Sequence, residues 1–392
     1  MTKRGLILAV VLALAACGEA PRDVSENVDP NELYYVPSII ASARKLVDDV
    51  QKESGMTYRR DAHAKAHGCV TATFTVRDDL PEALHTGVFV PGREYKAWIR
   101  FSNGNAAPQP DDTKDARGMA IKLMGVEGEK LLPSPPGAPP LETQDFLMIN
   151  HPVFFNRDVA EYEGFIRYQA DGSQFGYFFR DANPMDWQLR ELVIGSRLLG
   201  RISSPLQTQY HSMTAYALGV DADSTTAPPA YRHAMKYSAR SCTAKLPGKA
   251  DRKEPHYLRR VLAKHLDRQE ACFDFLVQVQ DPDKNMPIED PTVKWKTSDA
   301  PFQEVASIRI PVQDFDTPER NRFCEDLSFT PWHGHVDHRP LGGLNRIRKA
   351  VYEEIAVYRH ARNKRPFTEP RGWCLRLDGT DCPDAGDRAV TP

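Results

Sequence analysis

Short segments in which apolar and polar residues alternate, each bounded by Pro, Gly or Asp, recur along most of this 392-residue chain. Such alternation is typical of antiparallel strands with one buried face. The segments expected to be strands are CVTATFTV (69–76), GVFV (87–90), EYKAWIRFS (94–102), MAIKLMGV (119–126), DFLMIN (145–150), AYALGV (215–220), AMKYSAR (234–240), FDFLVQVQ (273–280) and EVASIRIPV (304–312). Helical spacing appears near residues 32–55, 186–200, 252–268 and 344–363. We therefore predict an α+β protein around a β-barrel or sandwich.

The composition excludes several classes of protein. A hydrophobic fraction of 41% excludes an intrinsically disordered chain, and a formal net charge of −2 excludes a general nucleic-acid binder. No repeat has a fixed period. Neither G-x-G-x-x-G nor G-x-x-x-x-G-K-[ST] occurs, so the sequence contains no recognisable nucleotide-binding βαβ unit.

Residues 1–16 are expected to form a signal peptide. Lys3 and Arg4 precede an apolar stretch over residues 6–14, which is shorter than the roughly 20 residues that a spanning helix needs. The four residues Leu-Ala-Ala-Cys at 14–17, which begin with the last residue of that stretch, resemble the lipobox of bacterial lipoproteins. In that family the cysteine is lipidated and becomes the mature N-terminus.

The lipobox resemblance implies a lipid anchor on Cys17. Residues 17–31 are polar and are expected to form a tether between the anchor and the folded chain. Gly18 rather than Asp follows the cysteine. By analogy this favours the outer membrane of the bacterial envelope, with the protein facing the periplasm. An ordinary secretory signal with a chance cysteine is the alternative interpretation.

Export would place the other cysteines in an oxidising compartment, where disulfides form. Six cysteines follow Cys17, at positions 69, 242, 272, 324, 374 and 382, and none forms the C-x-x-C pair of a zinc ribbon. Cys374 and Cys382 lie close together in a Gly- and Asp-rich tail, residues 366–392, and are the best candidates for a bridge. The pairing of the other four stays open.

Five short motifs occur in an order that is more informative than any one of them. They are R-D-A-H-A-K at 60–65, R-F-S at 100–102, D-T-K-D-A-R-G at 112–118, N-H-P-V-F-F at 150–155 and R-K-A-V-Y at 348–352. The series resembles the catalase family, specifically its shorter catalase-related branch, over roughly residues 56–362. This resemblance implies a catalase-like antiparallel β-barrel with surrounding helices and a pocket for haem b, in a domain spanning residues 32–365.

The resemblance also implies which residues act on a peroxide. His63 is expected to take a proton from the peroxide and return it, because imidazole titrates near pH ~6.5. Ser102 would orient the His63 ring, and Asn150 would orient the peroxide. The alternative for His63 is a structural histidine beside a strand. Asp112 matches an acidic residue of the family's substrate channel.

The predicted helix near residues 344–363 would supply the iron ligand. At about 100° per residue, Arg348, Tyr352, Ile355 and Arg359 share one face of this helix. Tyr352 is expected to ligate the haem iron as a phenolate, which the cationic Arg348 one turn earlier would stabilise. Tyr358 is a rival ligand, but its position directs it away from that face.

Further haem contacts follow from the resemblance. The two haem propionates require cations, and Arg60, Arg100 and Arg359 match the arginines that bind them in the family. Phe154 and Phe155 would pack against the porphyrin, although an ordinary core position is the alternative for one of them.

The predicted function is a haem-dependent, peroxide-consuming oxidoreductase, a catalase or a peroxidase, that protects the cell envelope. Its partners would be a peroxide and an electron donor, and the sequence leaves homo-oligomer formation open. Ala62 stands where typical catalases carry Val, which would widen access for larger peroxides. The alternatives are an enzyme that rearranges fatty-acid hydroperoxides and a haem-binding lipoprotein without turnover.

A second candidate site, for a metal ion, is the histidine cluster His333-Gly-His335-Val-Asp337-His338, which places three imidazoles and a carboxylate within six residues. Imidazoles suit zinc or copper. A structural turn that leads into the predicted ligand helix is the better interpretation.

Overall fold

The computed structural model describes residues 26–134, 141–179, 183, 187–220, 231–244, 251–365, 367 and 369–373. The strands are β1 (Ala66–Val76), β2 (Glu94–Asn103), β3 (Arg117–Met124), β4 (Thr143–Ile149), β5 (Tyr210–His211), β6 (Tyr216–Val220), β7 (Tyr231–Ser241), β8 (Ala271–Val279) and β9 (Gln303–Ile310). The α-helices are α1 (Glu32–Ser54), α2 (Val159–Ala170), α3 (Leu189–Leu198), α4 (Tyr257–Leu266), α5 (Pro318–Asp326) and α6 (Gly343–Asn363).

Eight of these strands close into an antiparallel barrel. The strand order is β5-β4-β3-β2-β1-β9-β8-β7, and β5 also pairs with β7, which completes the ring, while β6 pairs with β7 outside it. Closure leaves the barrel without free edges. Phe74, Phe146 and Phe275 fill the barrel interior, with ring centroids 4.8–6.2 Å apart. The predicted α+β class with a β-barrel is therefore confirmed.

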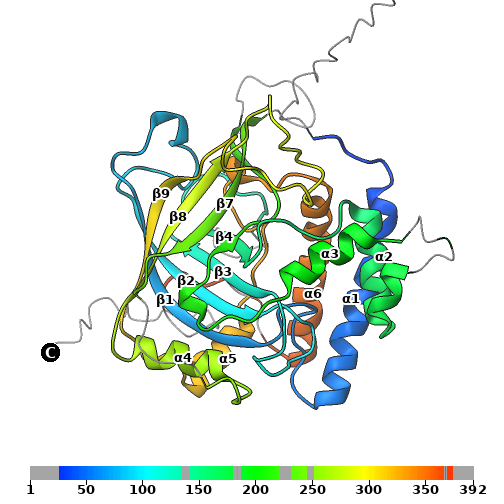
Figure 1. Ribbon diagram of the computed structural model, residues 1–392. Helices are drawn as coiled ribbons and strands as arrows, with labels where there is room; N and C mark the ends of the chain where they lie inside the picture. The colour runs from blue at the N-terminus through cyan, green and yellow to red at the C-terminus, as the bar shows by residue number, and fades with distance from the viewer. Residues whose placement is uncertain are drawn as a thin grey trace, which may run out of the picture.

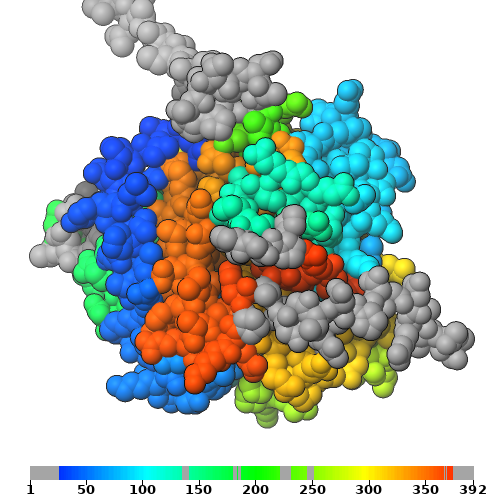
Figure 2. Space-filling model, turned by 180° about the vertical axis from the view of Figure 1, so that it is seen from behind, coloured from blue at the N-terminus to red at the C-terminus, as the bar shows by residue number. Residues whose placement is uncertain are grey.

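Helices α1, α2 and α6 form a layer beside the barrel, and α4 and α5 lie at one end of it (Figure 1). The layer has an apolar core of its own, in which Ile39 and Val47 of α1 pack with Ile347 and Val351 of α6. Figure 2 shows α1 and α6 side by side on the far face of the molecule. Helix α1 ends at Gly55, whose left-handed φ of 65° is typical of a helix C-cap.

The predicted elements differ from the observed ones in four places. Residues 87–90 form a turn rather than a strand, because Gly87 has φ +54° and packs directly against the ring of His338. Helices α2 and α5 and the two-residue strand β5 are not among the predicted segments. The helices expected near 32–55, 186–200, 252–268 and 344–363 are present as α1, α3, α4 and α6.

Two disulfides join strands and helices within the described residues. Cys69 on β1 is bonded to Cys324 on α5, and Cys242 is bonded to Cys272 on β8. The proposed bridge between Cys374 and Cys382 lies outside the described residues, as do the predicted signal peptide and Cys17.

Glu26, within the segment expected to be a tether, contacts the folded domain. The Glu26 carboxylate is buried and forms ion pairs with Arg339 and Arg346. Arg346 lies in the first turn of α6 and also pairs with Glu32 of α1. The Glu26 side chain therefore packs on the domain, whereas residues 27–31 are exposed. No helix in the described part of the chain is long and apolar enough to cross a membrane.

Candidate active site

A cavity of about 330 Å³ lies between the barrel and the helical layer, which is within the range of small-molecule sites. Its barrel side is formed by residues of β2, β3 and β4 and of the loop before β1, among them His63, Arg100, Ser102, Gly118, Met148 and Ile149. Its helical side is formed mainly by residues of α2 and α6, among them Tyr162, Ile166, Ile347, Arg348, Tyr352, Ile355 and Arg359. The cavity is thus bounded by both layers.

Helix α6 presents the predicted face to the cavity, because Arg348, Tyr352, Ile355 and Arg359 all line it. Arg348 donates a hydrogen bond from Nη2 to the Tyr352 hydroxyl at 3.1 Å. Burial opposes the charge on Arg348, but the neighbouring tyrosine oxygens, Tyr352 first, raise its pKa above the ordinary value. The Arg348 guanidinium thus lies directly beside the Tyr352 oxygen. Tyr358 points away and donates to Asp48 on α1 at 2.7 Å.

His63 lies on the barrel side of the cavity in a strained backbone conformation. Its φ is +58°, in the left-handed region that non-glycine residues rarely adopt. The His63 N–H donates to the carbonyl of Gly104, and Nδ1 lies 3.0 Å from the Ser102 hydroxyl. A Cβ on Gly118 would lie 2.5 Å from His63 Nδ1, so only glycine at this position leaves room for the ring.

The surroundings of His63 keep its imidazole neutral. Burial, followed by the charges of Arg100 and Arg348, lowers the pKa of His63 to about 4. Arg100 also donates from Nη2 to the His63 carbonyl at 2.8 Å. Near neutral pH this histidine therefore has one ring nitrogen available as a proton acceptor.

Arg60, Arg100 and Arg359 converge on one end of the cavity. Burial and mutual repulsion lower the pKa of Arg100 well below its ordinary value, and burial, followed by Arg60, lowers that of Arg359 to about 9. Glu325 is the carboxylate that pairs with Arg60, at 3.1 Å. The buried Nε of Arg100 has no hydrogen-bond partner. This excess of buried positive charge fits a ligand with two carboxylates, and the haem propionates meet that requirement.

Asp61 adds a carboxyl group to the same end of the cavity. Burial raises the pKa of Asp61 to about 6, although Arg60 and Arg359 oppose the shift. Its charge therefore offsets the arginine cluster only partly in mildly acidic solution.

Asn150 directly follows β4. Its side chain accepts from the backbone N–H of Arg117 at 2.7 Å. Leu147, Met148 and Ile149 of β4 line the cavity, and Asn150 is not among the lining residues. The role of Asn150 in orienting a peroxide stays a prediction.

Phe154 and Phe155 both line the cavity, with their ring centroids 4.7 Å apart. Ala62, next to His63, also lines it. Asp112 is exposed and is not a lining residue, whereas the buried Asp115 is. Asp115, three residues after Asp112, is thus the acidic residue of this loop that lines the cavity, and the channel position of Asp112 stays a prediction.

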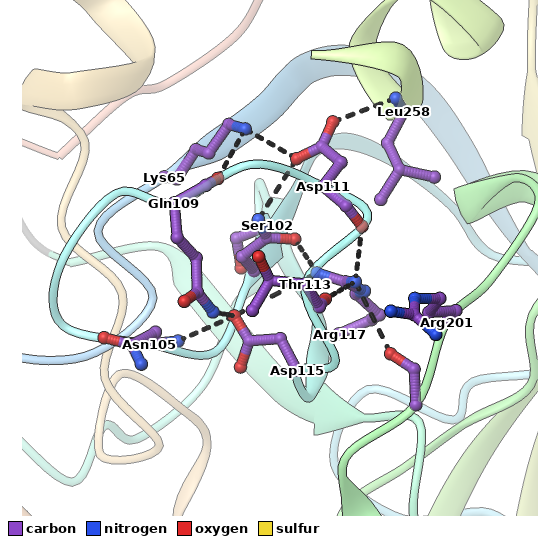
Figure 3. Close-up of polar contacts among 12 residues, drawn as sticks. Lys65, Ser102, Asn105, Gln109, Asp111, Thr113, Asp115, Arg117, Arg201 and Leu258 are labelled. Atoms are coloured by element: carbon purple, nitrogen blue, oxygen red, sulfur yellow. Dashed lines mark hydrogen bonds and ion pairs between the residues drawn. The ribbon is translucent and has the colours of Figure 1, made fainter. Parts of the chain in front are cut away.

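A buried ionic network supports the loop that carries Asp115 (Figure 3). Lys65 donates to Asp111 Oδ1 at 2.6 Å, and Arg117 donates to the Asp111 carbonyl at 2.9 Å. Lys65 is only two residues from His63, so the network fixes the start of β1 and the His63 backbone together. The sequence motif included Lys65 and Arg117 but gave no sign that they meet at Asp111.

The three histidines of the histidine cluster at residues 333–338 each have a different structural partner. His333 Nδ1 lies 3.2 Å from Asp145, and His338 Nε2 accepts from the Val88 N–H at 3.0 Å. His335 caps a short helical turn by accepting from the Asp337 N–H. Within the residues that the structure describes, no group of three or more His, Cys, Asp or Glu could hold a metal ion. The structural interpretation of this turn is the one that these contacts favour.

The fold and the site together define a closed antiparallel barrel protein with a ligand cavity between the barrel and a helical layer. Residues 55–331, more than half of the chain, match the family model described as Catalase, and the chain belongs to the catalase family. The match ends before α6, so the placement of Arg348 and Tyr352 rests on the cavity geometry. No curated protein sequence matches the chain.

Solved catalase structures share the fold. A fungal catalase has a TM-score of 0.61 at 15% identity, covering 84% of this chain and 64% of that chain. Catalase A from Saccharomyces cerevisiae has a TM-score of 0.58 at 17% identity, covering 80% and 63%. A bacterial catalase has a TM-score of 0.57 at 16% identity, covering 100% and 75%. This chain therefore spans less than two thirds of the first two structures.

Proposed function

We propose that this protein is a haem-dependent oxidoreductase that consumes peroxides. The observation that carries the proposal is the hydrogen-bonded pair of Arg348 and Tyr352 on one wall of a cavity whose other wall presents a neutral His63. A tyrosinate is the axial iron ligand in catalases. The same cavity ends in three arginines, which suit the two haem carboxylates.

Tyr352 would hold the iron of haem b, while Arg60, Arg100 and Arg359 would bind its propionates. Phe154 and Phe155 would pack against the porphyrin and exclude water. Bound haem supplies the redox chemistry of peroxide reduction. The chain's own residues set the orientation of the haem and the protonation state of its surroundings.

His63 is suited to move the proton of a bound peroxide. In the tautomer in which Nδ1–H donates to the Ser102 hydroxyl, Nε2 is free to accept the proton and then to return it to the departing oxygen. The low pKa of His63 keeps Nε2 unprotonated before the reaction. Gly118 contributes by leaving space for the ring.

Ala62 lines the cavity beside His63 and is smaller than the Val of typical catalases, which supports organic hydroperoxides among the substrates. A fatty-acid hydroperoxide would fit this chemistry, and it could be either reduced or rearranged. Reduction yields an alcohol and consumes an electron donor, whereas rearrangement consumes none. Product analysis with a lipid hydroperoxide, with and without a dye donor, distinguishes the two reactions.

The haem assignment is tested by Tyr352→Phe, with Tyr358→Phe as the matched control. Tyr352→Phe removes the phenolate oxygen, so the ferric absorption spectrum of the haem-loaded protein should change and haem should be lost more readily. Tyr358→Phe should leave the spectrum unchanged, because its hydroxyl bonds Asp48 outside the cavity. An identical spectrum in wild type and Tyr352→Phe would refute the ligand assignment.

We also propose that the protein is a lipoprotein of the bacterial envelope, anchored at Cys17 and facing the periplasm. The lipobox at residues 14–17 supports this. Cys17→Ser should shift the protein out of the membrane-anchored lipoprotein fraction, and globomycin should cause the wild-type precursor to accumulate. Cell fractionation and N-terminal mass spectrometry check both outcomes. A soluble mature protein that begins at another residue would contradict the proposal.

A further inference from the structure

The disulfide between Cys69 and Cys324 joins the two parts of the chain that position the arginine cluster. Cys69 on β1 is the direct cross-strand partner of Arg100 on β2. Cys324 lies in the last turn of α5, immediately before residues 325–328. The Cα atoms of the two cysteines are 5.6 Å apart. One covalent link therefore connects the strand pair that carries Arg100 to the end of α5.

The backbone at the end of α5 holds the other two arginines. Arg60 Nη2 donates to the Cys324 carbonyl at 3.3 Å and also bonds the Leu327 carbonyl. Arg359 donates to the carbonyls of Glu325 at 2.6 Å and Leu327 at 2.8 Å. Both guanidinium groups are thus oriented by carbonyl groups within three residues of Cys324.

The arginine cluster needs such support, because its members repel one another. Arg60 and Arg359 both contribute to lowering the pKa of Arg100. Helix α5 has only nine residues, of which Phe323 and Cys324 are buried. A helix this short is marginal without tertiary contacts. The disulfide is the covalent contact that fixes its end.

We propose that the Cys69–Cys324 disulfide is a positioning device for the recognition of carboxylates. It holds Arg60 and Arg359 at a fixed distance from Arg100, so that the three guanidinium groups together bind the two propionates. This inference rests on the proposed function in that it takes the dicarboxylate to be haem. The second disulfide offers a matched control, because Cys242 and Cys272 link β7 and β8 and neither lines the cavity.

The test compares haem with haem dimethyl ester, in which both carboxylates are masked. Equilibrium affinities for the two are measured on the full-length protein and on two double variants, Cys69→Ala/Cys324→Ala and Cys242→Ala/Cys272→Ala. In the first variant the ratio of the affinity for haem to the affinity for the ester should fall at least about tenfold. A tenfold change corresponds to the free energy of about one well-placed charged hydrogen bond. The second variant should keep the wild-type preference. A fall in affinity for both ligands with an unchanged ratio would show general loosening and overturn the inference.

A second measurement applies if the Cys69→Ala/Cys324→Ala variant does not fold. The wild-type protein is reduced with a phosphine, the free thiols are counted, and the same ratio of affinities is measured together with amide exchange at residues 325–328. Loss of the preference with faster exchange in this segment supports the inference, and an unchanged preference overturns it. If the wild type binds neither ligand, the proposed function itself fails, and this inference fails with it.

Discussion

His63 is a residue at which the backbone and the side chain are both constrained. The left-handed backbone of His63 costs roughly 1–2 kcal/mol for an ordinary residue, and the adjoining network of Lys65 and Asp111 holds it in place. The motif at residues 60–65 was sufficient to select this histidine. It could not reveal that Gly118, more than 50 residues later, leaves the space that the ring occupies.

The constraint on His63 leads to a prediction for two substitutions. His63→Ala should slow the reaction of the haem-loaded protein with hydrogen peroxide by ~10²–10⁴-fold, the usual contribution of a general acid–base group. Gly118→Ala should also slow it, because the new Cβ would displace the imidazole. Gly195→Ala is the control, since nothing lies within 4 Å of its Cβ position. Stopped-flow absorbance provides the rates. A wild-type rate in Gly118→Ala would show that the ring position is not critical.

Asn150 shows what the motif leaves open. The motif N-H-P-V-F-F correctly located the end of β4 at the cavity, where Met148 and Ile149 line the wall. The motif did not predict that the Asn150 side chain accepts from the backbone N–H of Arg117. This contact depends on the pairing of β4 with β3, in which Ile149 lies opposite Gly118.

At the level of elements, α6 was predictable and α2 and α5 were not. The buried residues of α6 recur at helical spacing, and its Arg and Tyr residues occupy the adjoining stripe. In α2 the buried face includes Glu161 and Gly164, which interrupt the apolar pattern. Helix α5 is mostly charged and buries only two residues. Tertiary contacts, which the sequence pattern does not encode, stabilise these two helices.

The pairing of β3 with β4 contains a buried ionic cluster whose removal should be costly. Lys122 on β3 pairs with Asp145 on β4 and with Glu369, and the Lys122 and Asp145 side chains are both fully buried. Lys122→Met leaves two carboxylates without their cation, which should lower the free energy of unfolding by about 3–5 kcal/mol. The exposed pair of Arg93 and Glu127 is the control, and Arg93→Ala should cost no more than about 1 kcal/mol. Urea denaturation measures both, and equal losses would contradict the argument.

For the whole molecule, alternation of apolar residues predicted a barrel or a sandwich without choosing between them. The choice depends on β5, which has two residues and pairs with both β4 and β7. Strands this short have no periodicity to detect. The closure of the barrel, and with it the curvature that places Arg100 and Ser102 at the cavity, could therefore not be predicted from the alternation, whereas the resemblance of the motifs to the catalase family did predict a barrel.

The buried histidines predict how stability changes with pH. Burial lowers the pKa of His63, His211 and His338 to about 4 and that of His67 to about 3. Between pH ~6.5 and ~4 the unfolded chain binds protons at these histidines and the folded chain does not. The free energy of unfolding should therefore fall on acidification, by about 1.4 kcal/mol per pH unit for each net proton. Asp61 acts in the opposite direction, because its raised pKa of about 6 lets the folded chain bind a proton first.

The four histidines together bind more protons in the unfolded chain than Asp61 binds in the folded chain. The urea midpoint should therefore decrease steadily from pH 7 to pH 5. Denaturation curves followed by circular dichroism at several pH values in this interval measure the effect. A midpoint that stays constant or rises on acidification would show that these histidines are not buried in their neutral form.

The interior of the molecule is divided between a barrel core and a helical core, and the cavity lies between them. The barrel core around Phe74 and Phe275 and the helical core around Ile39 and Ile347 are separate apolar clusters, and residues of both line the cavity. We expect the two cores to open as separate cooperative units, and a cofactor in the cavity would contact both. A cofactor would then leave the cavity only when the layer of α1, α2 and α6 opens. The rate at which these helices exchange their amide protons would report directly how firmly the cofactor is held.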